Sequence, residues 1–165
     1  MPNSTATRRA FTEKLGGAPH SKSSLRLWLR LLSCSMIIER RIRVRLEEDF
    51  QTTLPRFDVM AALEREPDGL TMSQLSAALL VSNGNVTGIV NRLIEELLVV
   101  RTVESGDRRI ATVRLTRKGR ETFQRMARSH EKWVDKMFAG VSDAQMAQLM
   151  KLLAGVRHSI DAHVD

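Results

Sequence analysis

The chain has 165 residues but only one cysteine, no tyrosine and an aromatic content of 4%. A single thiol, that of Cys34, cannot form a disulfide within the chain, so the sequence carries no sign of an oxidising compartment. A reducing environment is the simplest assumption, and we expect a cytoplasmic protein. Cys34 lies in the apolar segment "LLSCSM", where low thiol reactivity is expected.

Long hydrophobic runs are also missing. The longest apolar stretches, such as Leu25 to Leu32, are interrupted by arginines and fall far short of the ~20 residues that a membrane span needs. The segment from Met1 to Leu15 has no apolar core of the kind that signal peptides carry. We therefore expect neither a targeting segment nor a membrane partner.

The motifs of the common enzyme classes are absent as well. The chain has no phosphate-binding loop, no dinucleotide-binding glycine pattern, no zinc-protease motif and no C-x-x-C pair. Its four histidines, His20, His130, His158 and His163, never stand four residues apart, so a helical metal site is not expected. The sequence predicts a protein that is not an enzyme and that holds no metal or cofactor.

The composition that remains suits a folded, basic protein. An apolar content of 42% can build a core, and 26 Lys and Arg against 19 Asp and Glu give a net charge of +7, which favours a polyanion or an anionic ligand as partner. Residues 1–22 mix small, polar and basic types without a sustained period, which predicts a flexible basic tail. Residues 23–165 are expected to form a single domain.

Helical patterns occupy most of that domain. Apolar residues at helical spacing predict a long helix from about Ser23 to Phe50. Pro55 suits the first turn of a second helix, which the segment 67–69 ends. A capping box, Thr71 with Gln74, predicts that a short third helix begins at Thr71.

A fourth helix follows, although its first residues, "SNGNVTG", are poor helix formers. Its apolar stripe falls at helical period on Val86, Ile89, Val90, Leu93, Ile94 and Leu97. Ser82 is the expected N-cap, and it offsets the cost of a glycine within the helix. The opposite face carries small or flexible residues, Asn85, Thr87, Gly88, Asn91 and Arg92, so another surface can approach this helix closely.

A β-hairpin with a basic tip comes next. Residues 99–104 and 110–115 are rich in β-formers, and the turn between them carries Asp107, Arg108 and Arg109. Thr116 then caps a helix that runs to about Ala139, and a second capping box at 142–145 opens the last helix. The predicted fold class is mainly α with a small β-hairpin, or α+β.

This order of elements resembles the multiple antibiotic resistance regulator (MarR) family of bacterial transcription factors. The resemblance rests on "LTMSQLSAALLVSNGNVTGIVNRLIEE" and "GDRRIATVRLTRKG". The second segment contains the D-x-R motif of the family's wing at 107–109 and the L-T-x-x-G motif at 115–119. One position departs from the family: Leu97 stands where a glycine usually ends the recognition helix in a left-handed conformation.

The resemblance implies a winged helix-turn-helix over about 53–116, with dimerisation helices over about 23–50 and 117–163. A homodimer would bind a pseudo-palindromic operator in double-stranded DNA, the recognition helix entering the major groove and the wing the minor groove. The residues expected at the DNA are Ser82, Asn83, Asn85, Thr87, Gly88, Asn91, Arg92, Asp107, Arg108 and Arg109. The alternatives for these residues are a solvated helix face and a turn closed by a surface ion pair.

A weaker resemblance, to the branch of the family that regulates degradation of aromatic acids, implies a repressor that a small aromatic acid or an aryl-coenzyme A thioester releases from DNA. The apolar residues expected at such a ligand are Trp28, Leu32, Met36, Phe57 and Met60, and the cations are Arg26, Arg30, Arg40 and Arg41. The alternative is that the apolar residues are core and the arginines a solvated face.

Two other functions stay open at this point. One is a winged helix used for protein–protein contact, in which the basic tip is incidental. The other is redox sensing through Cys34, as in family members whose sensing cysteine is hydrogen-bonded to tyrosines. The absence of tyrosine argues against redox sensing here.

Overall fold

The structure is a computed structural model, and it describes residues 19–79, 83–103 and 111–163. Its elements, in chain order, are α2 (Pro19–Phe50), α3 (Leu54–Arg65), β1 (Leu70–Thr71), α4 (Met72–Leu79), α5 (Asn83–Glu95), β2 (Val99–Val103), β3 (Ala111–Leu115), α6 (Arg117–Phe138) and α7 (Asp143–His163). This order confirms the predicted mainly helical fold with a small hairpin. The predicted tail, 1–22, lies mostly outside the described residues, and α2 begins within it, at Pro19.

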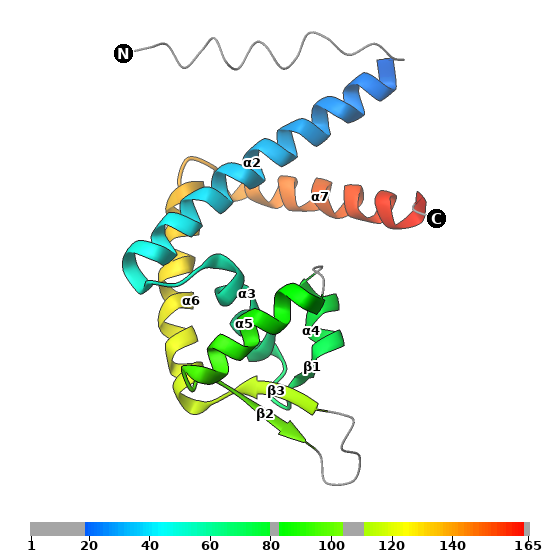
Figure 1. The fold of residues 1–165 in the computed structure, drawn as a ribbon. Helices are drawn as coiled ribbons and strands as arrows, with labels where there is room; N and C mark the ends of the chain where they lie inside the picture. Colours follow the sequence, from blue (N-terminus) through cyan, green and yellow to red (C-terminus); the bar gives the residue numbers. More distant parts are fainter. Residues whose placement is uncertain (1–18, 80–82, 104–110, 164–165) are drawn as a thin grey trace.

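The elements form two regions that α6 connects (Figure 1). Helices α3, α4 and α5 pack with the sheet into one unit, called the winged unit below. Helix α6 leads from the sheet to α2, and α7 and the first half of α2 extend beyond the winged unit. The hairpin β2–β3 lies at the opposite end of the molecule from these two helices.

The sheet has three antiparallel strands in the order β1-β3-β2. In the hairpin Val99 lies opposite Leu115, and on the other side of β3 Leu70 lies opposite Val113. Strand β1 was not predicted, because two residues are too short for an alternating pattern to be visible. Thr71 therefore both pairs with β3 and caps α4.

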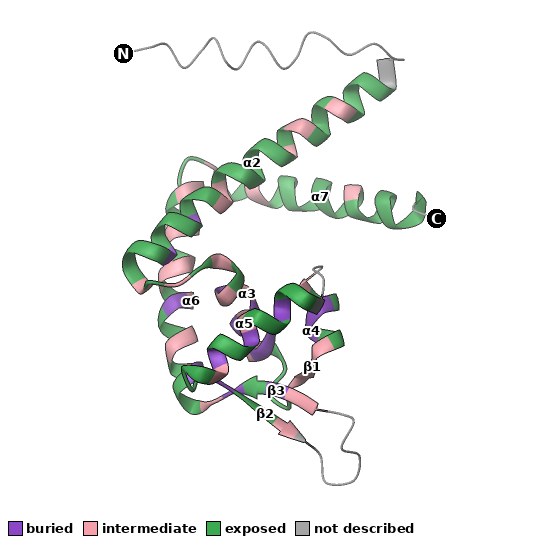
Figure 2. Ribbon diagram, viewed as in Figure 1, coloured by how far each residue is buried: buried purple, intermediate pink, exposed green. Residues whose placement is uncertain are grey.

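The core lies almost entirely in the winged unit and on the neighbouring faces of α2 and α6 (Figure 2). Val86, Val90 and Leu93 of α5 are each 0% exposed, and Ile89 and Ile94 are partly buried against the core, which confirms these five positions of the predicted apolar stripe. Leu97 was wrongly included, because it follows the end of α5 and is 68% exposed. The three fully buried side chains belong to one buried cluster that also contains Leu75 of α4 and Met126 of α6. Burial of the stripe fixes which face of α5 is turned to solvent.

The capping boxes form as predicted. The Thr71 amide donates to Oε1 of Gln74 at 2.8 Å, and the Gln74 amide donates to Oγ1 of Thr71 at 3.2 Å. Ser142 and Gln145 make the same reciprocal pair at 2.9 and 3.3 Å. Ser82, the predicted cap of α5, lies outside the described residues.

The end of α5 takes a left-handed turn in spite of its leucine. Leu97 has a φ of 62°, the Leu97 amide donates to Ile94 O at 2.9 Å, and the Leu98 amide donates to Leu93 O at 2.9 Å. This is the Schellman pattern, for which glycine is the usual residue. Leu97 thus occupies the conformation that glycine adopts at this point in the family, at the cost of a Cβ in a crowded backbone region.

We predict that Leu97→Gly raises the free energy of unfolding by about 1 kcal/mol, because glycine removes the left-handed strain. The leucine side chain is 68% exposed, so its removal forfeits little burial. Thermal denaturation at equal protein concentration measures the change, with Leu97→Ala as the control that shortens the side chain but keeps the Cβ. A Leu97→Gly protein no more stable than Leu97→Ala would contradict the prediction.

Candidate nucleic-acid interface

Helix α5 presents a continuous polar face to solvent. Asn85, Thr87, Gly88, Asn91 and Arg92, all predicted from the sequence, are exposed. The structure brings these five residues together on one side of one helix, opposite the buried stripe. Asn83 begins α5, but its side chain, like all of Ser82, lies outside the described part of the chain.

The exposed face of α5 also includes two glycines, Gly84 and Gly88, which have no side chain. A Cβ added at Gly84 or at Gly88 would meet nothing within 4 Å, so neither glycine is needed for packing inside the protein. No acidic residue stands in the first turn of α5, where free backbone amides and the positive end of the helix dipole favour an anion. The start of α5 therefore suits close approach of a phosphate backbone.

The strands of the hairpin add two basic residues that the sequence analysis did not select. Arg101 on β2 and Arg114 on β3 are exposed. Both residues lie in strands that the sequence predicted. The signal that could have identified them was an arginine in a strand next to a basic turn. Asp107, Arg108 and Arg109, predicted for the tip, lie outside the described residues.

The L-T-x-x-G motif holds the end of α5 against the start of α6. The Thr116 hydroxyl donates to Leu97 O at 2.7 Å and accepts from the Gly119 amide at 2.9 Å, so it also caps α6. Lys118 Nζ donates to Glu96 O at 2.9 Å. A Cβ on Gly119 would lie 1.9 Å from Leu98 O, so only glycine permits this contact. The motif thus sets where the exposed face of α5 lies relative to α6.

The residues predicted for an aromatic ligand do not come together. Phe57 and Met60 are core residues, 7% and 1% exposed, so they have almost no surface for a ligand, which corrects the sequence interpretation. Trp28, Leu32 and Met36 lie exposed along the projecting part of α2. Arg26 and Arg30 are exposed on the same part of the helix.

Arg40 and Arg41 do line a groove, of about 790 Å³, between α2 and α6. Its lining residues are Ile37, Arg40, Arg41, Val44, Arg45, Glu48, Trp133, Lys136 and Met137, and it is called the α2–α6 groove below. Four cations and one carboxylate therefore border a mainly apolar floor. The sequence analysis missed Trp133 and Lys136 because they come from a helix about ninety residues further along the chain.

Two titrating groups lie half-buried where α2, α3 and α6 meet. Burial raises the pKa of Asp58 above its usual value, and Glu39 raises it further, while Arg43 lowers it. Burial lowers the pKa of His130, whose ring stacks on Phe57 with centroids 5.0 Å apart. Both shifts favour the uncharged forms, so this junction is poorly suited to hold charge.

Within the described residues no group of three or more His, Cys, Asp or Glu is placed to hold a metal ion. None of the described helices is long and apolar enough to cross a bilayer. Cys34 is exposed on α2, whereas its apolar segment suggested a sheltered thiol.

The helix pair α4–α5, followed by the hairpin β2–β3, defines a winged helix-turn-helix. The MarR family model matches residues 50–110. A MarR family transcriptional regulator from Silicibacter pomeroyi superposes with a TM-score of 0.74 at 33% identity, over 87% of this chain and 99% of that one. The chain belongs to the MarR family of winged-helix transcription regulators, which are DNA-binding proteins and not enzymes.

Two further relatives agree with this assignment. The HTH-type transcriptional regulator YkoM of Bacillus subtilis is 31% identical over 118 residues, which are 71% of this chain and 74% of YkoM. Streptococcus pneumoniae FabT, solved in complex with DNA, has a TM-score of 0.71 at 25% identity, over 84% of this chain and 98% of FabT.

We predict that Asp58→Asn stabilises the fold at pH 7 and that the gain shrinks as the pH falls toward about 4. The pKa of Asp58 is higher in the folded state than in the unfolded state, so its carboxyl stabilises the fold only when it is protonated, at pH values below the unfolded pKa. This contribution is lost as the pH rises through the folded pKa, whereas the asparagine stays uncharged at every pH. Thermal denaturation across this pH range measures the effect. The exposed Asp49, changed to Asn, controls for the loss of one negative charge, and equal gains at every pH would refute the assignment.

Proposed function

We propose that this protein is a repressor that binds operator DNA as a homodimer, with α5 in the major groove, and that a small anionic ligand releases it. The observation that carries the proposal is that α5 has two different sides: an apolar side on which Val86, Val90 and Leu93 are fully buried, and an exposed side of mostly small polar residues on a winged fold. Bulky residues at such positions would hold the helix away from base edges.

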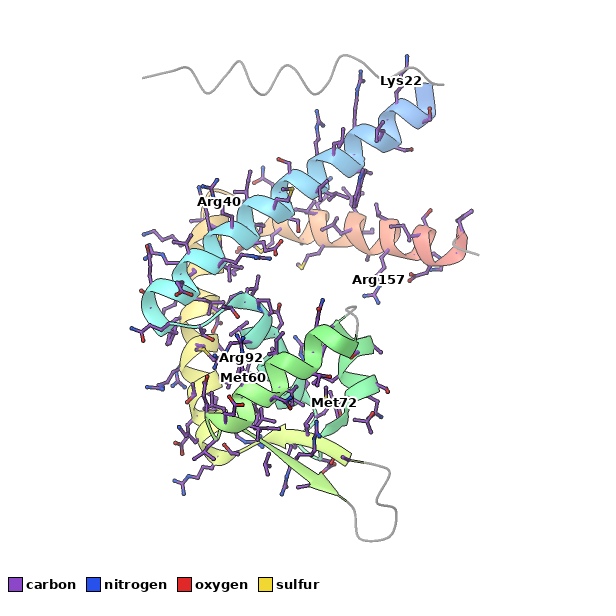
Figure 3. All side chains as sticks on the ribbon, in the orientation of Figure 1. Lys22, Arg40, Met60, Met72, Arg92 and Arg157 are labelled. Atoms are coloured by element: carbon purple, nitrogen blue, oxygen red, sulfur yellow. The ribbon has the colours of Figure 1, made fainter. Side chains whose placement is uncertain are left out.

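Four exposed residues of α5 have a suitable partner in the groove. Asn85 and Asn91 can pair bidentately with adenine, and Thr87 can contact a thymine methyl group. Arg92, labelled in Figure 3, can reach a phosphate or a guanine. We assign the same role to Ser82 and Asn83 at the start of the helix, and to Asp107, Arg108 and Arg109 at the wing, from the sequence alone.

A substitution at Gly88 should change DNA binding and stability in opposite directions. Gly88→Leu should stabilise the helix by somewhat less than about 1 kcal/mol, because leucine is the better helix former and a Cβ at this position meets nothing within 4 Å. The same change should weaken operator binding, because the side chain would stand between the helix and the bases. Thermal denaturation and a gel shift on the operator measure the two effects, and tighter or unchanged DNA binding would exclude α5 from the groove.

Asn91 tests base recognition directly. Asn91→Ala should relax discrimination at one base-pair position by about 1–3 kcal/mol and leave binding to random DNA unchanged. Binding to a set of operators with single substitutions measures this. Equal losses on all sequences would assign Asn91 to the DNA backbone, and an absence of binding to any DNA would favour a protein-interaction module instead.

The homodimer follows from apolar surface that the chain itself does not cover. The large apolar side chains exposed on α2 and α7 are Leu27, Trp28, Leu32, Met36, Ile37, Val44, Leu149, Met150, Leu152, Leu153 and Ile160. No residue of α7 is buried. A second copy would cover this surface and set two α5 helices about 34 Å apart, one turn of DNA.

We predict that the protein sediments as a dimer at micromolar concentration and that Leu152→Glu dissociates it. Leu152 is 61% exposed in the isolated chain, and a carboxylate there would be buried without a partner in the dimer. Gln124→Glu, on the exposed side of α6, is the matched control for an added charge. A wild-type monomer, or a Leu152→Glu dimer as tight as the control, would exclude this interface.

The α2–α6 groove supports the proposal that the ligand is an aromatic acid or an aryl-coenzyme A thioester. Trp133 offers an aromatic surface, and Arg40, Arg41, Arg45 and Lys136 offer charge for a carboxylate or phosphates. Relatives named as the repressor IacR of Pseudomonas putida and the activatory protein BadR of Rhodopseudomonas palustris are 26% and 27% identical to this chain. Because one of these relatives is named a repressor and the other an activator, repression by this protein is part of the proposal.

We predict release of the operator by benzoyl- or hydroxycinnamoyl-coenzyme A, or by the free acids. A coupling of about 1–3 kcal/mol weakens DNA binding about 5–150-fold, so a modest site suffices. Arg41→Gln should abolish the response, whereas Lys22→Gln, near the other end of α2 from Arg40 (Figure 3), should not. No response to either class, or the same response in both variants, would exclude this ligand site, and transcription in vitro would distinguish repression from activation.

A further inference from the structure

Three consecutive residues near the start of α3 interact with three different elements. Arg56 forms an ion pair with Glu96, directly after α5. Phe57 stacks on Phe123 of α6 with ring centroids 5.4 Å apart. Asp58 lies within electrostatic reach of Glu39 on α2. The start of α3 is therefore in contact with α6 and with the end of α5, and it lies within electrostatic reach of α2.

The Arg56–Glu96 pair is unlike the ion pairs within α2, α6 and α7. It joins residues forty positions apart, and the Arg56 side chain is only 19% exposed. Those other pairs, such as Arg117 with Glu121, link neighbouring turns of one helix, and Arg117 is 93% exposed. Exposed pairs within one helix contribute little to stability. The Arg56–Glu96 pair has one sheltered partner, the Glu96 side chain being 45% exposed, and because it joins two elements it restricts how they move against each other.

Glu96 is held from a second side as well. Its backbone carbonyl accepts from Lys118 Nζ at 2.9 Å, while its carboxylate meets Arg56. Residue 96 thus links α3 and α6 at the point where α5 ends. Figure 3 shows α3 and α5 side by side through the labelled Met60 and Arg92, so this link lies at one end of a packed helix pair.

We propose that Arg56 and Glu96 are positioning residues for operator recognition: their ion pair sets the angle at which α5 meets the DNA, and neither side chain touches a base. The inference rests on the proposed role of α5. The N-terminal end of α5 reads the bases, so a small rotation about its far end displaces Asn85 and Gly88 most. Loss of the pair then reduces selection of the operator more than it reduces general attraction to DNA.

Glu96→Gln distinguishes positioning from charge. Removing a carboxylate makes the protein more basic, and general electrostatics predicts tighter binding to all DNA. Positioning predicts the opposite for the operator, a loss of about tenfold, the usual scale of coupling between contacting residues. Glu121→Gln is the matched control, since it removes the same charge from a pair within one helix. The operator is obtained by selection from random sequences with wild-type protein.

The readout is the ratio of operator affinity to random-DNA affinity on the same sample, which does not depend on the folded fraction. The ratio should fall in Glu96→Gln and in Arg56→Gln, fall no further in the double variant, and recover in the charge swap Arg56→Glu with Glu96→Arg. A ratio in Glu96→Gln equal to that in Glu121→Gln, or additive losses in the double variant, would overturn the inference alone. A wild-type protein that selects no operator would overturn the proposed function and this inference with it.

Discussion

The arrangement of the winged unit depends on the contacts that the backbone carbonyl of Leu98 makes with Thr116 and Gly119. This carbonyl accepts from the Thr116 amide at 3.0 Å, and it lies so close to Gly119 that no side chain fits there. Because Leu98 directly follows the left-handed turn at Leu97, this contact fixes the end of α5, the start of β2 and the start of α6 at one point. The hairpin and α5 therefore cannot move independently near this joint.

Burial is unevenly spread along the chain, and the difference has a functional meaning. The winged unit encloses its own core, so its shape is set by one chain. Helix α7 has no buried residue, and its apolar side chains gain nothing from the fold of a single copy. Apolar surface of this extent is typical of a permanent contact with another protein surface. The proposed dimer would therefore complete the fold as well as place two α5 helices on DNA.

Local chemistry made much of the fold predictable from the sequence. Reciprocal capping boxes, a helical apolar stripe and a hairpin pattern depend on residues close in the chain, and each was confirmed. Strand β1 was missed because two residues carry no period. Phe57 was wrongly assigned to the ligand, and Trp133 was missed, because the burial of Phe57 and the position of Trp133 in one groove with Arg40 depend on packing between distant segments. The wing tip stays a prediction.

The residues least suited to a helix, in α5 and directly after it, have different roles in the structure. Gly84 and Gly88 each cost helix stability, and open space around them shows that no internal contact requires them. Leu97 also costs stability, but its carbonyl and those on either side are held by Thr116 and Lys118. A helix that is weak at its exposed start and firmly held at its end can adapt its first turns to a surface without losing its place. Weak local propensity that no packing explains is most simply attributed to what binds there.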